Sequence, residues 1–303
     1  MSPRALDPVV IDRDLPFDPR TLPPRPPETG VLMADASGFD VAYVINPHMA
    51  GNIGTVDREK ARAQWQALTD VYRRLGYEVH VIDAVEGLPD LVFTANQSFP
   101  GQLPDGRWVV LQSHMHAEVR RPEEDVVADW HRARGATVDK MSREQGFIPF
   151  EGMGDAHWFP GRRLIIGGHG FRTHRDIYPR IATVFQVPVV TLDLVDPRFY
   201  HLDTCLAPLD ENTALFVPEA FRADAVHVLS ALFERLIEVP LDEAVDLLAC
   251  NGHCPDGKHF IVQQGAMKTA AKVSALGYEV VEVDTSEFLK SGGSVFCMKL
   301  MLP

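Results

Sequence analysis

Apolar residues along the chain follow two patterns, one typical of strands and one typical of helices. Short runs rich in β-branched residues, such as 39–46 and 77–83, predict strands. Between these runs, residues 57–76 place apolar side chains at helical spacing and finish at Gly76, which predicts a helix. The alternation of strands and helices predicts an α/β fold.

The same order of elements recurs along the rest of the chain. Further strands are predicted at 91–95, 108–112, 137–141, 156–159, 163–167, 187–192, 200–208, 213–217, 246–250, 259–263 and 278–284, and helices at 123–136, 176–185, 222–235 and 267–276. A strand–strand–helix–strand unit thus recurs about five times, with a period near 50 residues that is typical of repeated supersecondary units. If the units form a ring, their strand ends meet at one central mouth.

The two ends of the chain differ from this pattern. Residues 1–30 contain eight prolines and no periodicity, so we expect an arm on the surface, followed by a single domain over 31–303. Near the other end, residues 295–300 alternate and predict a final strand that closes the ring. This strand presents Cys297 shortly after Gly292-Gly293-Ser294, where paired glycines let the backbone approach a ligand closely.

Composition narrows the possible partners. The 303 residues are 46% hydrophobic, which suffices for a sizeable core. A net charge of −13 argues against a nucleic-acid partner and permits a small cationic substrate. No apolar run is long enough to predict a membrane span, and the N-terminus lacks an apolar signal segment. The four cysteines are typical of reduced thiols, so we expect a cytoplasmic protein.

Candidate chemistry lies in polar clusters at the ends of predicted strands, where rigid scaffolds commonly present functional groups. These clusters are residues 89–96, 151–155, 170–173 and 199–204. In the last, His201 and Asp203 are two apart on a predicted strand, so their side chains point to the same side. The candidates also have structural alternatives. A lone thiol such as Cys297 often packs in the core, and Asp residues like those of the clusters are common in turns.

In combination the clusters resemble the guanidino-modifying superfamily, the penteins, which includes dimethylarginine dimethylaminohydrolases, arginine deiminases, arginine dihydrolases and amidinotransferases. The resemblance covers about residues 31–302. It rests on Ile45-Asn46-Pro47 and on residues 90–96, 151–155, 170–172, 199–204 and 287–297, which follow the family's order. It implies a five-bladed α/β-propeller of ββαβ repeats around a central active site.

The resemblance also implies roles for eight residues. Cys297 matches the nucleophile, His201 the general acid and base, and Glu151 the carboxylate that orients the imidazole. Substrate-binding positions are matched by Asn46, Asp90, Asn96, Arg172 and Asp203. Among these, Arg172 resembles an arginine that holds a substrate carboxylate. Neither a metal nor an organic cofactor is implied.

A zinc site is the alternative for Cys250-Asn-Gly-His253-Cys254. This segment lacks the C-x₂-C spacing of zinc sites, and the chain has no matching second pair. We therefore expect structural thiols there.

The implied activity is cysteine-dependent hydrolysis of a small guanidino compound, such as arginine or an Nω-methylarginine, through a covalent thiouronium intermediate. Carboxylates accept from the edges of a guanidinium group, and its positive charge favours a thiolate at Cys297. His201 then protonates the departing amine and deprotonates the attacking water. Transfer of the amidino group to an amine acceptor is the alternative. The negative net charge argues against a pentein that binds ribosomal RNA. The sequence leaves open whether identical subunits associate.

Two positions depart from the family pattern. Asn96 stands where deiminases and dimethylaminohydrolases have a second Asp, and this variant most resembles arginine dihydrolases, which remove two ammonias and leave ornithine. Its NH₂ group can donate to the oxygen of a ureido product, although Asn96 could instead cap a turn. The arginine that usually follows 109–111 is also missing; Ser113, His114 and His116 are nearest, with Arg120 and Arg121 further on.

Overall fold

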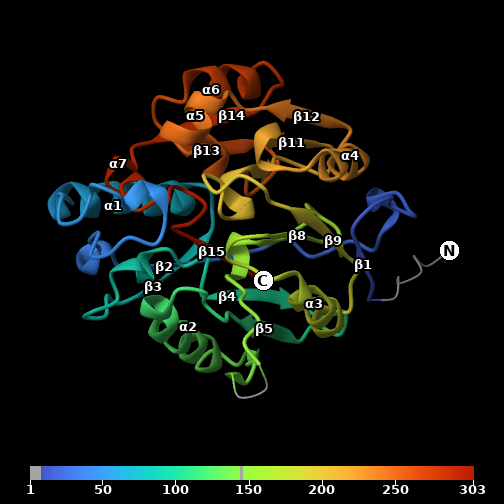
Figure 1. The fold of residues 1–303 in the computed structure, drawn as a ribbon, viewed down its shortest axis with the longest axis horizontal. Coiled ribbons are helices and arrows are strands. Elements are labelled where there is room, and N and C mark those ends of the chain that lie inside the picture. Colours follow the sequence, from blue (N-terminus) through green and yellow to red (C-terminus); the bar gives the residue numbers. More distant parts are fainter. Residues whose placement is uncertain (1–7, 144–145) are drawn as a thin grey trace.

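The computed structural model describes residues 8–143 and 146–303. Within these residues, the strands form five small sheets. In Figure 1 the sheets surround the centre of the view and most of the helices lie toward the outside. The molecule is therefore built from several small α/β units rather than from one large sheet.

Three sheets share the complete predicted order of elements. They consist of β4 (Ser98–Gln102), β5 (Trp108–Gln112), α2 (Arg121–Arg132) and β6 (Thr137–Asp139); β7 (Ala156–Trp158), β8 (Ile165–His169), α3 (Tyr178–Phe185) and β9 (Val189–Asp193); and β10 (Leu206–Pro208), β11 (Thr213–Phe216), α4 (Ala223–Leu232) and β12 (Arg235–Glu238). In each, the first two strands pair antiparallel and the third pairs parallel to the second. A parallel partner requires a crossover, which the helix provides.

The other two sheets are variants of this unit. In one, β13 (His259–Gln263) and β14 (Glu279–Val283) pair in parallel across α6 (Met267–Ser274), and His253 forms an isolated bridge to Ile261. In the other, β2 (Gly30–Ala34) and β3 (Glu78–Ile82) are joined by α1 (Arg58–Arg74). The last strand, β15 (Leu300–Leu302), pairs antiparallel with β2, so the C-terminal end of the chain completes the first sheet.

Helix α1 shows how the sequence pattern forms these units. Its buried face carries Ala61, Trp65 and Leu68, which stand three or four residues apart. The Asp57 side chain accepts a hydrogen bond from the Lys60 N–H at the start of the helix. This agrees with the amphipathic helix predicted over residues 57–76.

Several predicted strands are wrong. Residues 39–46 are irregular, and residues 91–95 begin inside a 3₁₀ turn at Pro89–Val92. Residues 246–250 run from the last residue of α5 (Leu241–Asp246) into a second 3₁₀ turn at Ala249–Asn251. Residues 91–95 are buried throughout, and residues 39–46 and 246–250 are buried in part, which gives these segments apolar positions like those of a strand. Local propensity does not show whether a neighbouring strand is available to pair with.

The predicted final strand over residues 295–300 is also wrong in its first part. Residues 295–298 form a turn, and β15 begins only at Leu300. The backbone N–H groups of Ser294 and Cys297 donate to the Asn251 side-chain oxygen instead of to a neighbouring strand. Cys297 therefore lies in a turn, not on a strand face.

The boundary between α4 and β12 was missed as well. The predicted helix over 222–235 ends at Leu232, because Phe233 takes an extended conformation. Residues Arg235–Glu238 then pair with β11 as β12. The short helices α5 and α7 (Ser286–Leu289) were not predicted.

The proline-rich arm packs against the sheets. The short strand β1 (Val10–Ile11) pairs in parallel with β9, and Pro24 forms an isolated bridge with Arg162. The first seven residues of the predicted arm lie outside the described residues. Strand β2 begins at Gly30, next to the predicted boundary.

The fold bears on the predictions about the cysteines and about membrane spans. All four cysteines are free thiols, as predicted. Among the described helices, none is both long enough and apolar enough to cross a membrane.

Candidate active site

Turns from several sheets meet around a small cavity of about 20 Å³. This volume holds about one water molecule. Six of the eight residues predicted for the site line it: Asn46, Asp90, Asn96, Arg172, His201 and Cys297. The other two, Glu151 and Asp203, lie directly behind His201 and Cys297 as their hydrogen-bond partners.

Asn251 holds the turn that carries Cys297. Its side-chain oxygen accepts from the Ser294 and Cys297 N–H groups at 3.0 and 3.2 Å. Its Nδ2 donates to the Asp203 carbonyl at 3.1 Å and lies 3.2 Å from the Cys297 sulfur. Both ends of this buried amide are therefore used to fix the thiol.

Gly292 allows the chain to reach this turn. It has φ +84°, and a Cβ there would lie 2.6 Å from the Tyr200 hydroxyl oxygen. Gly292 thus takes the positive φ that favours glycine, and it packs closely against Tyr200.

The Cys297 thiol is paired with a carboxyl group. Its Sγ lies 3.2 Å from Asp203 Oδ2, while Asp203 Oδ1 has no hydrogen-bond partner among the described residues. Burial, together with the negative charge of Asp203, raises the pKa of Cys297 well above its usual value. Burial likewise raises the pKa of Asp203 to about 7. In the substrate-free protein, Cys297 is thus a neutral thiol.

His201 is held by an ionised carboxylate. Its Nε2 donates to Glu151 Oε2 at 2.7 Å, because a carboxylate can only accept. Burial alone would raise the pKa of Glu151, but the positive charge of Arg172 and the bond with His201 hold that pKa well below its usual range. Arg172 Nη1 lies 3.2 Å from Glu151 Oε2. Because Nε2 is the ring nitrogen bonded to Glu151, Nδ1 is the nitrogen not engaged by that carboxylate.

The local structure around His201 differs from the prediction. His201 caps a 3₁₀ turn at Leu202–Thr204 that contains Asp203, so the two residues are not on a strand. The prediction that the two side chains point to the same side of a strand was therefore wrong. Asp203 contacts the Cys297 sulfur and does not line the cavity.

Gly154 brings Asn96 and His201 close together. A Cβ at this position would lie 2.6 Å from Asn96 Nδ2 and 3.2 Å from His201 Nδ1. Any larger residue would push one of these groups away from the cavity.

Asp90 and Asn46, which also line the cavity, are both bonded to Ser291. Asp90 accepts from the Tyr43 hydroxyl at 2.7 Å and from the Ser291 hydroxyl at 3.1 Å. Asn46 donates from Nδ2 to the Ser291 carbonyl at 2.9 Å and caps the following 3₁₀ turn with its oxygen. Both side chains therefore support the segment just before Gly292.

Arg120 is a member of the cavity that the prediction did not include. Its Nη1 donates to Asn96 Oδ1 at 3.0 Å, and its Nη2 donates to the Asp90 carbonyl at 3.1 Å and to Glu123 at 2.8 Å. Asn96 Nδ2, in contrast, has no hydrogen-bond partner among the described residues. Arg120 thus fixes the amide so that its oxygen faces the arginine, and the Asn96 side chain does not cap the turn.

The missed residues left only weak signals in the sequence. Arg120 is named among the residues that follow 109–111, but its i,i+3 pair with Glu123 is of a kind that usually belongs to an exposed helix face. Asn251 lies inside the segment considered as a zinc site. No local pattern shows that its amide faces Cys297, which is 46 residues away.

Comparison with known proteins identifies the family. A family model described as N,N dimethylarginine dimethylhydrolase, eukaryotic, matches residues 48–302. The chain belongs to the dimethylarginine dimethylaminohydrolase family. The predicted resemblance is confirmed, as is the enzyme class, a cysteine-dependent hydrolase of guanidino C–N bonds.

Relatives in this family differ in their activities. A dimethylarginine dimethylaminohydrolase of Mycobacterium tuberculosis is 39% identical over 88% of this chain and 84% of its own length. The bifunctional arginine dihydrolase/ornithine cyclodeaminase ArgZ of Synechocystis is 37% identical over 89% of this chain. The match covers only 37% of that bifunctional relative.

Solved structures of family members share the pentein fold. The N-terminal domain of ArgZ from cyanobacteria, solved as a Cys-to-Ser variant with bound substrate, has a TM-score of 0.83 and 34% identity, covering 90% of this chain and 97% of that domain. A dimethylarginine dimethylaminohydrolase with an S-methyl-L-thiocitrulline adduct has a TM-score of 0.76 and 22% identity, covering 91% of this chain and 100% of that one. The second likeness supports the fold only.

Proposed function

We propose that the chain hydrolyses the guanidinium group of free arginine, with Cys297 as nucleophile, His201 as acid and base, and Glu151 as the carboxylate that orients His201. The observation that carries this proposal is the cavity itself. A thiol and a carboxylate-backed imidazole meet there beside polar groups that suit the N–H groups of a guanidinium better than methyl groups. Asp90 and Asp203 supply the nearby negative charge.

The positive charge of the substrate activates the thiol. A unit charge about 4 Å from a thiolate contributes about 4 kcal/mol at an effective dielectric constant near 20. This corresponds to about three pKa units, enough to oppose the effect of burial on Cys297. The cation also favours the ionised form of Asp203. The thiolate is therefore formed when the substrate binds.

The proton transfers run through His201. The thiol proton passes to His201 Nδ1, and the Cys297 sulfur attacks the guanidinium carbon. His201 returns that proton to the departing ammonia, which leaves a thiouronium group on Cys297. His201 then takes a proton from water, and the water oxygen attacks the same carbon. The carbon–sulfur bond breaks with its electron pair on sulfur, and His201 returns its proton to that sulfur. The second water proton is released to solvent as citrulline forms.

An outer hollow accommodates the amino-acid end of the substrate. This hollow of about 450 Å³ shares Ile45, Asn46, Arg172 and Tyr200 with the inner cavity. Arg172 lies on the boundary between the two, with its guanidinium over the Tyr200 ring at 5.0 Å. The substrate carboxylate therefore binds Arg172 in the outer hollow while its guanidinium group lies inside. Arg120, which is enclosed by Asn96, Asp90 and Glu123, shapes the inner end.

Asn96 makes a second round of hydrolysis favourable. Citrulline has lost the positive charge and gained a carbonyl oxygen, and Asn96 Nδ2 is an unused buried donor next to His201. A donor to that oxygen holds the ureido carbon for a second attack. Loss of a second ammonia leaves the carbamate of ornithine, which decomposes to ornithine and carbon dioxide.

The propeller arrangement of the five sheets is also part of this proposal. The five sheets are arranged as the blades of an α/β-propeller, with residues 31–303 as one catalytic domain and the site at the centre. The order of elements, the closure of β15 on β2 and the ring in Figure 1 support this arrangement. A cytoplasmic location and the absence of a nucleic-acid partner also stay predictions.

Mass spectrometry of the products from a panel of guanidines tests the proposal. We expect arginine to give citrulline and ornithine, Nω,Nω-dimethylarginine to react more slowly, and Cys297→Ser to be inactive with an unchanged unfolding midpoint. Added amines test the transferase alternative, which predicts amidino-labelled acceptors. Activity retained in Cys297→Ser, or release of dimethylamine in preference to ammonia, contradicts the proposal.

A further inference from the structure

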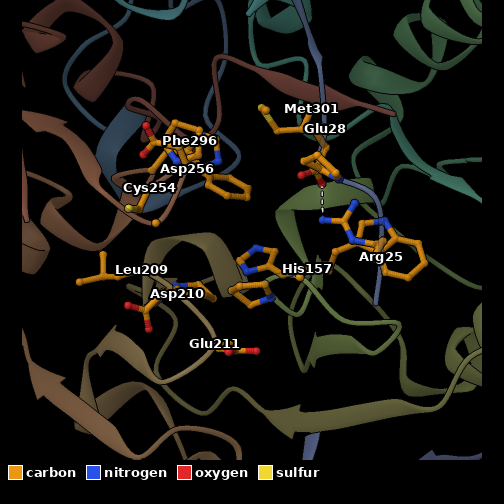
Figure 2. A pocket seen from close by; sticks show the side chains of 18 of the residues that line it. Arg25, Glu28, His157, Leu209, Asp210, Glu211, Cys254, Asp256, Phe296 and Met301 are labelled. Atoms are coloured by element: carbon orange, nitrogen blue, oxygen red, sulfur yellow. Dashed lines mark ion pairs between the residues drawn. The ribbon is translucent and has the colours of Figure 1, made fainter. Parts of the chain in front are cut away.

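A further cavity, distinct from the inner cavity and the outer hollow of the active site, adjoins the turn that carries Cys297. It has a volume of about 360 Å³, and Phe296 and Lys299 line it, whereas Cys297 lines the first cavity. Among the described residues, no lining residue is common to both cavities. Figure 2 shows it between the arm, with Arg25 and Glu28, and the segments of Leu209 and Cys254.

Lys299 contributes a buried amine without a hydrogen-bond partner to the wall of this cavity. Its side chain is completely buried, and its Nζ lies 3.2 Å from the centroid of the Phe296 ring. Within the described chain, Nζ has no hydrogen-bond partner and forms no ion pair within 4 Å. A buried ammonium group without a partner is costly, and such a group is rare unless something else pairs with it. The hydrolytic reaction proposed above does not use this amine.

Arg25 adds a second free donor. Its Nη2 pairs with Glu28 at 2.6 Å, as the dashed line in Figure 2 shows, and its guanidinium lies over Trp158. Its Nε has no partner among the described residues. The charge of Glu28 is therefore already matched by Arg25, and the charge of Lys299 is not.

The remaining acids of the cavity have partners of their own. Asp210 accepts from the Tyr278 hydroxyl, Glu211 pairs with Arg162, and Asp256 accepts from His259. Among the described lining residues, the buried side-chain nitrogens without a partner are Lys299 Nζ, Arg25 Nε and the two ring nitrogens of His157. Donors therefore outnumber the single acceptor that a neutral His157 ring offers. The cavity walls also include the apolar side chains of Trp158, Leu209, Phe296 and Met301.

We propose that this cavity binds a small carboxylate with an apolar tail, whose anionic end pairs with the Lys299 ammonium group and takes Arg25 as a second donor. The volume and the mixture of apolar walls with a few polar groups are those of small-molecule sites. A carboxylate is preferred because Lys and Arg offer only donors. The site is separate from the active site and does not depend on the reaction there.

Binding of such an anion is coupled to protons. Burial lowers the pKa of Lys299 to about 7, although the charges of Glu28, Asp203 and Cys297 partly oppose this effect. A bound carboxylate favours the charged amine, so affinity is highest below pH 7 and falls by up to about tenfold per pH unit above it.

The groups that face Lys299 contribute unequally in this range. The pKa values of His157 and His253 are both lowered by burial, that of His157 to about 3, so both rings are neutral. Glu28 forms an ion pair with Arg25. Asp203 has a pKa of about 7 and titrates in the same range, so Asp203→Asn serves to separate its effect.

The test measures binding of 4-methylpentanoate and of its neutral amide to the whole protein by calorimetry at pH 6 and pH 9. We expect the carboxylate to bind at least tenfold more tightly than the amide at pH 6, and at least tenfold more weakly at pH 9 than at pH 6. Lys299→Met should lose both differences, whereas Asp203→Asn should keep them. Arg172→Gln is the matched control in the other cavity and should leave this binding unchanged.

The opposite results overturn the proposal. These are equal affinity for the amide, no binding of the carboxylate at pH 6, unchanged binding in Lys299→Met, or loss of binding in Arg172→Gln, which assigns the carboxylate to the active site. If Lys299→Met does not fold, Glu28→Gln on the arm takes its place. Removal of this nearby negative charge should tighten binding at least threefold, and unchanged or weaker binding refutes the site.

Discussion

The Asn96→Asp substitution tests the chemistry proposed for the second round of hydrolysis. In the native site, Asn96 Oδ1 accepts from Arg120 and Nδ2 is the unused donor. An aspartate retains an acceptor for Arg120 but replaces the donor by a second acceptor. We expect the first hydrolysis to be kept, because a carboxylate accepts from a guanidinium, and the second to be impaired.

The magnitude follows from the hydrogen bond that the ureido oxygen loses. A buried acceptor left without its donor costs about 1–3 kcal/mol. At about 1.4 kcal/mol per factor of ten, this slows the second hydrolysis about 5- to 150-fold. Repulsion between the carboxylate and the ureido oxygen acts in the same direction. The ratio of ornithine to citrulline should therefore fall by one to two orders of magnitude.

The assay quantifies citrulline and ornithine by mass spectrometry during the conversion of arginine. Ser113→Ala is a suitable control, because the Ser113 hydroxyl donates to the Asn96 backbone carbonyl and not to its side chain. The control should keep the wild-type product ratio. An unchanged ratio in Asn96→Asp would show that Asn96 has only a structural role, and the explanation for the second round would fail.

Three further predictions concern the groups that prepare Cys297 and His201. Glu151→Gln keeps the shape but removes the charge beside His201, so kcat should fall about 10²- to 10⁴-fold; activity within twofold of wild type contradicts this role. Asn251→Ala leaves two buried N–H groups unpaired, so the free energy of unfolding in urea should fall by about 2–6 kcal/mol; an unchanged midpoint rejects the proposed clamp. For wild type, kcat/KM with arginine should rise about tenfold per pH unit below pH 7 and level off above it, because Asp203 with its pKa of about 7 must be ionised beside the substrate cation. Asp203→Asn should lose this acidic limb, and a limb that persists assigns the titration to another group.

The sequence by itself determined the repeating order of elements and most of the candidate site. Strands that pair with neighbours, such as β5 and β13, have the β-branched pattern that predicted them, and the buried face of α1 has helical spacing. Cys297, His201 and Glu151 were found because their short motifs occur in one order along the chain. Both kinds of pattern lie in short segments of sequence, so they can be read without knowledge of the fold.

Only the tertiary structure decided how these residues are held. Asn251 replaces a strand partner for the Cys297 turn, and Arg120 sets the orientation of the Asn96 amide, through contacts between residues 46 and 24 positions apart. The same holds for Lys299, whose alternation with Cys297 predicted a strand and whose burial beside a second cavity had no sequence signal. Burial and unpaired hydrogen-bonding groups depend on which segments meet in space, and local periodicity does not contain that information.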